Sequence, residues 1–129
     1  MSGYDLLFIY GNLLPGLRLE REMSSAHRLG VAQVHGQLYD IGSYPGLVSG
    51  VGLVSGEIYR VTPEHLRRLD AVEEMIPGNR AASLYWRDRI AVVTGDFAGQ
   101  EVWAYLYNQS VDGLRPIEGD YRRYLLNGL

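Results

Sequence analysis

The apolar residues of this chain are grouped into short runs that end at glycine or proline. The first run, residues 5–10, is nearly continuous and stops at Gly11, which is typical of a buried strand that leads directly into a turn. Residues 12–16 end in Pro-Gly and predict a loop. The charged stretch 17–28 predicts an irregular, partly helical connection.

Two more strands are expected next, separated by glycine-rich breaks. Residues 31–40 alternate between the two faces of a strand, and the segment 41–46 interrupts this pattern with glycine and proline. After a short extended piece at 47–48, the sequence Ser-Gly-Val-Gly at 49–52 predicts a turn. Residues 53–60 then predict a further strand.

One helix has clear start and stop signals. Thr62 is a good N-cap, Pro63 suits the first helical position, and an acidic residue follows in the first turn. Pro77-Gly78 prevents continuation much beyond Glu74. Between these limits apolar residues recur at helical spacing, at Leu66, Leu69 and Val72.

The last third of the chain predicts a hairpin and a short helical tail. Residues 84–93 and 101–107 are rich in strand-forming residues and are joined through glycines, which indicates antiparallel pairing. A helix inserted between the third and fourth strands does not follow the strict alternation of a doubly wound sheet. We therefore expect one α+β domain over residues 1–129, with a small mixed, mainly antiparallel sheet curled into a partial barrel and with one well-marked helix.

Charge and hydropathy limit the partners. The net charge of −3 gives no general attraction for nucleic acid or anionic lipid. Polar residues or glycines interrupt every apolar stretch well before the roughly 20 residues that span a bilayer, and residues 1–5 show no secretory signal pattern. We expect a cytoplasmic protein that binds neither nucleic acid nor membrane, and the sequence leaves its oligomeric state open.

Missing residue types exclude several chemistries. The chain has no cysteine, and its twelve basic residues are all arginine, so thiolate nucleophiles and Schiff-base or phosphate-loop lysines are excluded. His27, His35 and His65 lack the spacing of a metal-binding motif, so no metal is expected. No serine stands in a Gly-x-Ser-x-Gly elbow. Carboxylates, histidines and tyrosines remain as acid-base candidates.

The turn Tyr10-Gly11-Asn12-Leu13 is the first candidate site. A buried strand ends there at a glycine, and such a turn can present consecutive backbone N–H groups to a carboxylate or an oxyanion. An ordinary strand-to-loop turn has the same pattern, and taken alone these four residues favour that simpler interpretation.

Glu73 is the second candidate. It stands at the carboxyl end of the predicted helix, with Asp70 one turn before it and Glu74 next to it. The helix dipole and both neighbouring charges disfavour the ionised carboxylate, so a shielded Glu73 would have a raised pKa and could exchange a proton near neutral pH. A frayed helix end with spare acidic residues is the plainer alternative.

Three residues on or beside the predicted strands are secondary candidates. Tyr44 and Tyr85 are aromatic residues of the kind that most often fill a core or cover an edge. Arg87 can anchor a substrate carboxylate through two hydrogen bonds, although pairing with an acidic residue of the protein is the commoner use of such an arginine.

Taken together, the order and spacing of these segments resemble the γ-glutamylcyclotransferase-like family, in particular its γ-glutamylamine cyclotransferase type. The resemblance extends over almost the whole chain. It is carried by Phe8–Leu13 with Pro15-Gly16, Gly36–Val48, Val54–Tyr59, Leu69–Glu73, Tyr85–Arg87 and Gly119–Tyr121.

The resemblance implies an activity and assigns roles to residues. In that family the Tyr-Gly-x-Leu turn binds the γ-glutamyl group through backbone amides, which corresponds here to Tyr10, Gly11, Asn12 and Leu13. The Glu that closes the Leu-Asp-x-x-Glu motif is the catalytic acid/base, which corresponds to Glu73. The implied protein is a small mixed barrel without a cofactor that converts a small γ-glutamyl amine or γ-glutamyl amino acid to 5-oxoproline and a free amine.

The sequence departs from the family pattern at three positions. Asn12 stands where Ser or Thr is common, Glu74 replaces a usual Gly, and Gly46 replaces a common Ala. The first two bear on substrate identity more than on the type of reaction, so the leaving amine stays open. The alternative function is a non-catalytic member that keeps the pocket as a small-molecule or partner-binding module.

Overall fold

The computed structural model describes residues 3–127. Its elements, in chain order, are β1 (Asp5–Ile9), the 3-10 helix η1 (Glu20–Met23), β2 (His27–Asp40), β3 (Pro45–Val61), α1 (Pro63–Val72), β4 (Tyr85–Thr94), β5 (Glu101–Tyr107), β6 (Arg115–Ile117) and α2 (Tyr121–Asn127). None of the helices in this range is long and apolar enough to cross a bilayer.

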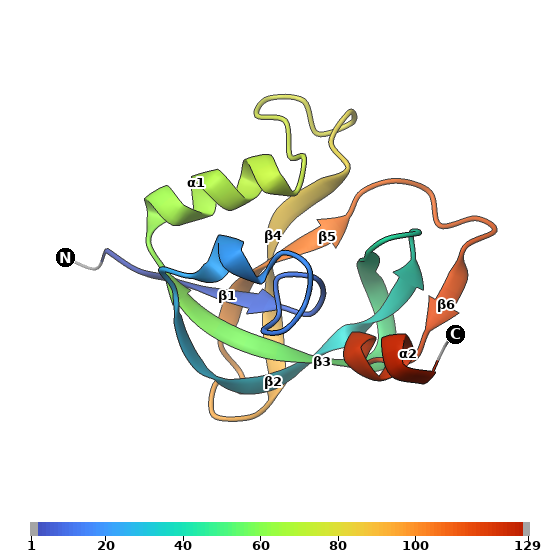
Figure 1. The fold of residues 1–129 in the computed structure, drawn as a ribbon, viewed down its shortest axis with the longest axis horizontal. Helices are drawn as coiled ribbons and strands as arrows, with labels where there is room; N and C mark the ends of the chain where they lie inside the picture. Colours follow the sequence, from blue (N-terminus) through green and yellow to red (C-terminus); the bar gives the residue numbers. More distant parts are fainter. Residues whose placement is uncertain (1–2, 128–129) are drawn as a thin grey trace.

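Five strands close into a barrel (Figure 1). Neighbouring strands follow the order β3-β1-β5-β4-β2, and additional pairing between β2 and β3 closes the ring, with β6 added to the far end of β2. Within residues 3–127, β1 and β5 form the parallel pair and the other pairs are antiparallel. The expected mixed, mainly antiparallel α+β fold is confirmed, and the sheet closes fully where a partial barrel was predicted.

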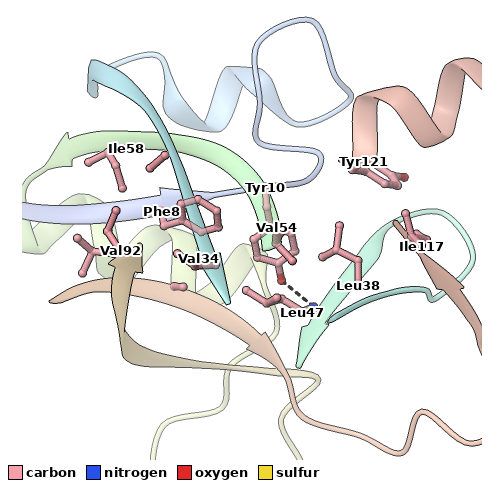
Figure 2. Close-up of a cluster of buried hydrophobic side chains, with 13 residues drawn as sticks. Phe8, Tyr10, Val34, Leu38, Leu47, Val54, Ile58, Val92, Ile117 and Tyr121 are labelled. Atoms are coloured by element: carbon pink, nitrogen blue, oxygen red, sulfur yellow. Dashed lines mark hydrogen bonds between the residues drawn. The ribbon is translucent and has the colours of Figure 1, made fainter. Parts of the chain in front are cut away.

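Strand β1 is apolar after Asp5 because both faces of this part are buried. Phe8 and Tyr10 point into the cluster that fills the barrel, whereas Leu7 and Ile9 point outward into a second cluster beneath α1. Figure 2 shows the inner cluster, in which the hydroxyl of Tyr10 accepts a hydrogen bond from the backbone N–H of Leu47 over 3.3 Å. Burial on both sides is what removes the usual alternation of a half-exposed strand.

Helix α1 begins as predicted and lies across the outside of the barrel (Figure 1). The Thr62 hydroxyl accepts a 3.1 Å hydrogen bond from the His65 N–H, and Pro63 occupies the first turn. Leu66 and Leu69 are buried in the outer cluster, which fixes the helix on the sheet and sets the place of its carboxyl end.

The predicted turn at 49–52 is wrong, because β3 runs through it. Val48 pairs with Gln37 and Leu53 with His35, so four residues of β3 bulge out opposite Gly36 alone. A Cβ added to Gly50 would lie 3.0 Å from the backbone carbon of Gly36. The glycines therefore allow a close approach of two backbones within a strand, and do not reverse the chain.

Two strand boundaries also differ from the expectation. Strand β2 begins at His27 rather than at residue 31, and the Arg28 side chain forms a 3.1 Å ion pair with Glu57 on the neighbouring strand. The short strand β6, which the sequence analysis did not predict, pairs Ile117 with Leu38. The predicted hairpin of β4 and β5 and the helical tail are confirmed.

Candidate active site

A cavity of about 250 Å³ lies where the end of β1 meets the carboxyl end of α1. Seven of the eight site residues predicted from the sequence line it, and Arg87 does not. The lining consists of Phe8, Ile9, Tyr10, Gly11, Asn12, Leu13, Arg18, Leu19, Tyr44, Pro45, Val72, Glu73, Glu74, Leu84, Tyr85 and Tyr105.

The turn after β1 presents backbone donors that have no partner among the described residues. No described residue accepts a hydrogen bond from the N–H groups of Gly11, Asn12 or Leu13. A Cβ on Gly11 would lie 2.7 Å from the Pro45 ring, so a glycine is required for the turn to pack against this wall. Backbone N–H groups without an acceptor are rare in proteins, and in a turn that lines a cavity such groups can bind an anion.

Asn12 holds the turn to the loop on the opposite side. Its Nδ2 donates a 3.0 Å hydrogen bond to the carbonyl of Ser43, next to Tyr44 in the cavity lining. Since this amide nitrogen is already engaged, the departure from Ser or Thr at position 12 alters how the rim is fixed.

Glu73 caps the carboxyl end of α1 and is partly buried. No described residue forms a hydrogen bond or an ion pair with its carboxylate. Burial, and then the negative charge of Glu74, raise the pKa of Glu73 from 4.5 to about 7. The expected contribution of Asp70 is absent from these causes. Near neutral pH this carboxyl group is present in both protonation states.

Glu74 occupies a position that favours glycine. Its φ is +57°, its N–H donates to the carbonyl of Ala71, and the next N–H, of Met75, donates to that of Asp70. These two bonds form a Schellman motif, in which the residue after the cap adopts the left-handed conformation. The left-handed conformation explains why Gly is usual at this position in the family. Glu74 adds backbone strain there and places a negative charge beside Glu73.

The Asp70 carboxylate has two partners, Arg87 outside the cavity lining and Tyr105 within it. Arg87 donates to both of its carboxylate oxygens, over 2.7 and 3.0 Å, and the Tyr105 hydroxyl donates to Oδ1 over 2.6 Å. The Arg87 guanidinium also lies 4.4 Å from the centre of the Trp103 ring. Arg87 thus pairs with an acidic residue of the protein, which was the alternative interpretation of this arginine. It does not line the cavity.

The tyrosine hydroxyls of the lining hold the backbone in place. Tyr85 donates to the carbonyl of Pro45, and Tyr10 to that of Tyr105, each over 2.5 Å. Burial raises the pKa of both phenols far above neutral, so they remain protonated donors. The Tyr85 ring also packs against Tyr44 and Tyr107, with centroids 6.1 and 5.7 Å away.

Several lining residues were missed by the sequence analysis. Arg18 is exposed at the cavity and forms no ion pair within residues 3–127, although it stands in a stretch read only as an irregular connection. Tyr105 faces the cavity from a predicted strand, where its pattern does not distinguish it from a core residue.

The structure also explains the departure from the family pattern at position 46. A Cβ added to Gly46 would lie 2.7 Å from that of Tyr107, which accounts for the absence of Ala.

No group of three or more histidine or acidic residues within the described range is placed to bind a metal ion. The chemistry available at the cavity is proton exchange at Glu73 and anion binding at the Gly11–Leu13 turn. Together these suit an acyl transfer in which an oxyanion develops near a general acid.

Comparisons with known proteins place the chain in a family. The model of the family "Gamma-glutamyl cyclotransferase, AIG2-like" matches residues 7–123. The gamma-L-glutamyl-butirosin B gamma-glutamyl cyclotransferase of Niallia circulans is 36% identical over 123 residues, covering 93% of this chain and 77% of that protein. The gamma-glutamylcyclotransferase family protein YtfP of Escherichia coli K12 is 36% identical over 117 residues, covering 89% and 94%.

A solved structure agrees with these matches at the level of the fold. The crystal structure of an AIG2-like protein from Mus musculus superposes with a TM-score of 0.77 at 24% identity, covering 92% of this chain and 88% of that one. The family match includes the turn after β1 and the end of α1, which form the cavity described above. The chain therefore belongs to the AIG2-like γ-glutamyl cyclotransferase family and is an enzyme of the γ-glutamylcyclotransferase type.

Proposed function

We propose that this enzyme converts a γ-glutamyl amine or γ-glutamyl amino acid to 5-oxoproline and a free amine, with Glu73 as the general acid and base. The observation that supports this most directly is a carboxyl group with a pKa of about 7 and no cationic partner among the described residues. It lines the same cavity as a turn with three backbone N–H groups that have no acceptor within residues 3–127.

The reaction begins with the α-amine of the substrate attacking its own γ-carbonyl carbon. A carbon–nitrogen bond forms to close a five-membered ring, and the bond to the departing amine breaks. Two protons must move from the attacking nitrogen to the departing one. A single carboxyl group that is half protonated near neutral pH can carry each proton in turn. The nucleophile is tethered, so the remaining tasks are to fold the substrate and to stabilise the oxyanion.

The wall formed by residues 10–19 would bind the anionic parts of the substrate. The N–H groups of Gly11, Asn12 and Leu13 would receive substrate oxygens, and Arg18 supplies a positive charge on the same side. Tyr44 and Tyr85 would cover the carbon chain of the glutamyl group from the opposite side.

Replacing Arg18 by Gln is expected to raise KM by about threefold to tenfold with little change in kcat, because the binding partner is lost and the proton carrier is retained.

The test is release of 5-oxoproline, measured by mass spectrometry, from a panel of γ-glutamyl amines and γ-glutamyl amino acids. Glu73→Gln keeps the size of the side chain but cannot take a proton, so kcat should fall roughly 10²- to 10⁴-fold while the circular dichroism spectrum stays native. Near-native turnover by this variant would overturn the role of Glu73.

A non-catalytic binding module predicts a different result. The wild-type protein would then release no product from any member of the panel, yet γ-glutamyl compounds would raise its melting temperature.

A further inference from the structure

A second hollow, of about 590 Å³, opens beside the active-site cavity. It is a groove between the end of α1 and the loop that leads to β4, the yellow loop at the top of Figure 1. Glu74 and Leu84 line both the groove and the active-site cavity, so the two spaces adjoin at these residues. The rest of the groove is mainly apolar and is formed by Ala71, Met75, Ile76, Pro77, Ala81, Ala82 and Gln109.

Hydrogen bonds from a buried serine fix the shape of this groove. Ser83 is fully buried, and its hydroxyl accepts a 2.7 Å bond from the Ile76 N–H and donates a 2.9 Å bond to the carbonyl of Asn79. The Gln109 side chain donates to the carbonyl of Ser83 over 2.8 Å. These hydrogen bonds connect the two sides of the loop, so the surface of the groove is preformed.

The charge of the groove is negative and located at its junction with the active site. Glu74 is the charged residue of the lining, is exposed, and has no ion-pair partner within residues 3–127. Arg80, the basic residue of the same loop, has its guanidinium 5.4 Å from the centre of the Trp86 ring. Arg18 stands elsewhere in the active-site lining and does not line the groove.

Glu74 directly follows the residue that hands a proton to the departing nitrogen, so the leaving group would pass beside it. An apolar groove that ends at a carboxylate suits a chain of methylene groups bearing an ammonium group. We propose that the groove receives the departing amine and that Glu74 binds a second, cationic group on it. The preferred substrates are then γ-glutamyl amides of diamines and other amines with more than one positive charge. This inference rests on the proposed function.

The experiment compares three γ-glutamyl amides with leaving groups of equal length: an α,ω-diaminoalkane, an n-alkylamine and an ω-amino acid. Release of 5-oxoproline gives kcat/KM for each. We expect the diamine amide to exceed the alkylamine amide by about threefold to fivefold at low salt, the size of one exposed ion pair, and the ω-amino acid amide to be the slowest. The preference should shrink at high salt.

Variants locate the effect. Glu74→Gln should bring the diamine-to-alkylamine ratio close to one, and because the ratio compares two substrates on one enzyme, any accompanying change at Glu73 cancels. Ile76→Glu adds a carboxylate to the groove and should increase the ratio. Glu64→Gln, at the other end of α1 and 77% exposed in its side chain, is the matched control and should leave the ratio unchanged.

The outcomes separate this inference from the proposed function. Equal rates for the three amides, or a preference for the ω-amino acid, would overturn the groove assignment while the cyclotransferase activity stands. No 5-oxoproline from any substrate would overturn both.

Discussion

Two carboxylates one turn apart at the end of α1 have opposite environments. Asp70 receives two hydrogen bonds from Arg87 and one from Tyr105, so its charge is compensated although it is buried. Glu73 has no such partner among the described residues, and its pKa rises to about 7. Burial with compensation produces a structural ion pair, whereas burial without it produces a group that can exchange protons.

A third carboxylate, like that of Asp70, is buried together with partners that compensate its charge. Glu57, buried in β3, pairs with Arg28 over 3.1 Å and with Arg122 over 3.5 Å, and it accepts a hydrogen bond from Tyr59. Interaction with this carboxylate contributes, after burial, to raising the pKa of Tyr59 to about 12. Glu73 is only partly buried, and it differs from both of these buried acids in having no partner among the described residues.

The largest effect on stability is expected at the compensated pair. Arg87→Ala leaves the Asp70 carboxylate buried and without its cation, which should lower the free energy of unfolding by about 3 kcal/mol. Urea denaturation would measure it. Arg68→Ala removes the exposed pair with Glu64 on the same helix and should cost at most about 0.5 kcal/mol. Equal losses in the two variants would mean that the buried pair contributes nothing particular.

The uncompensated carboxylate should make stability depend on pH. Folding raises the pKa of Glu73 from 4.5 to about 7, so the native state holds this proton more tightly than the unfolded state. Its stabilising contribution is complete below pH 4.5 and is lost as the pH rises to about 7. Relative to Glu73→Gln, the wild type should lose about 2 kcal/mol across this window, after allowance for partial exposure. Parallel pH profiles of the two proteins would contradict the shifted pKa.

The smallest effect is expected at Glu74, which links the helix cap to the acid-base group. Glu74→Gly relieves the positive φ and should raise the free energy of unfolding by about 1 kcal/mol. It also removes the second cause of the raised pKa of Glu73. The acidic limb of kcat/KM, measured with a γ-glutamyl alkylamine, should therefore move to lower pH. An unmoved limb, in a variant that is more stable, would leave burial as the sole cause.

Local patterns were sufficient for much of the fold. Thr62 and Pro63 mark the start of α1, Pro77-Gly78 limits its end, and the glycines between β4 and β5 predict their hairpin, because caps and turns depend on neighbours in the sequence. The turn at 49–52 was predicted wrongly since a glycine pair that permits a bulge has the same local signature as one that permits a reversal.

The residues of the candidate site divide in the same way, into those that the sequence predicts and those that only the fold brings together. The sequence by itself determined the Tyr10–Leu13 turn and the place of Glu73 at a helix end, and the family resemblance predicted a joint role for them. Only the tertiary structure decided that Arg87 neutralises Asp70, that Arg18 and Tyr105 reach the cavity, and that Glu74 joins it to a second groove. These facts depend on which side chains from distant segments meet, and such meetings follow from barrel closure and the packing of α1, which no single stretch of sequence specifies.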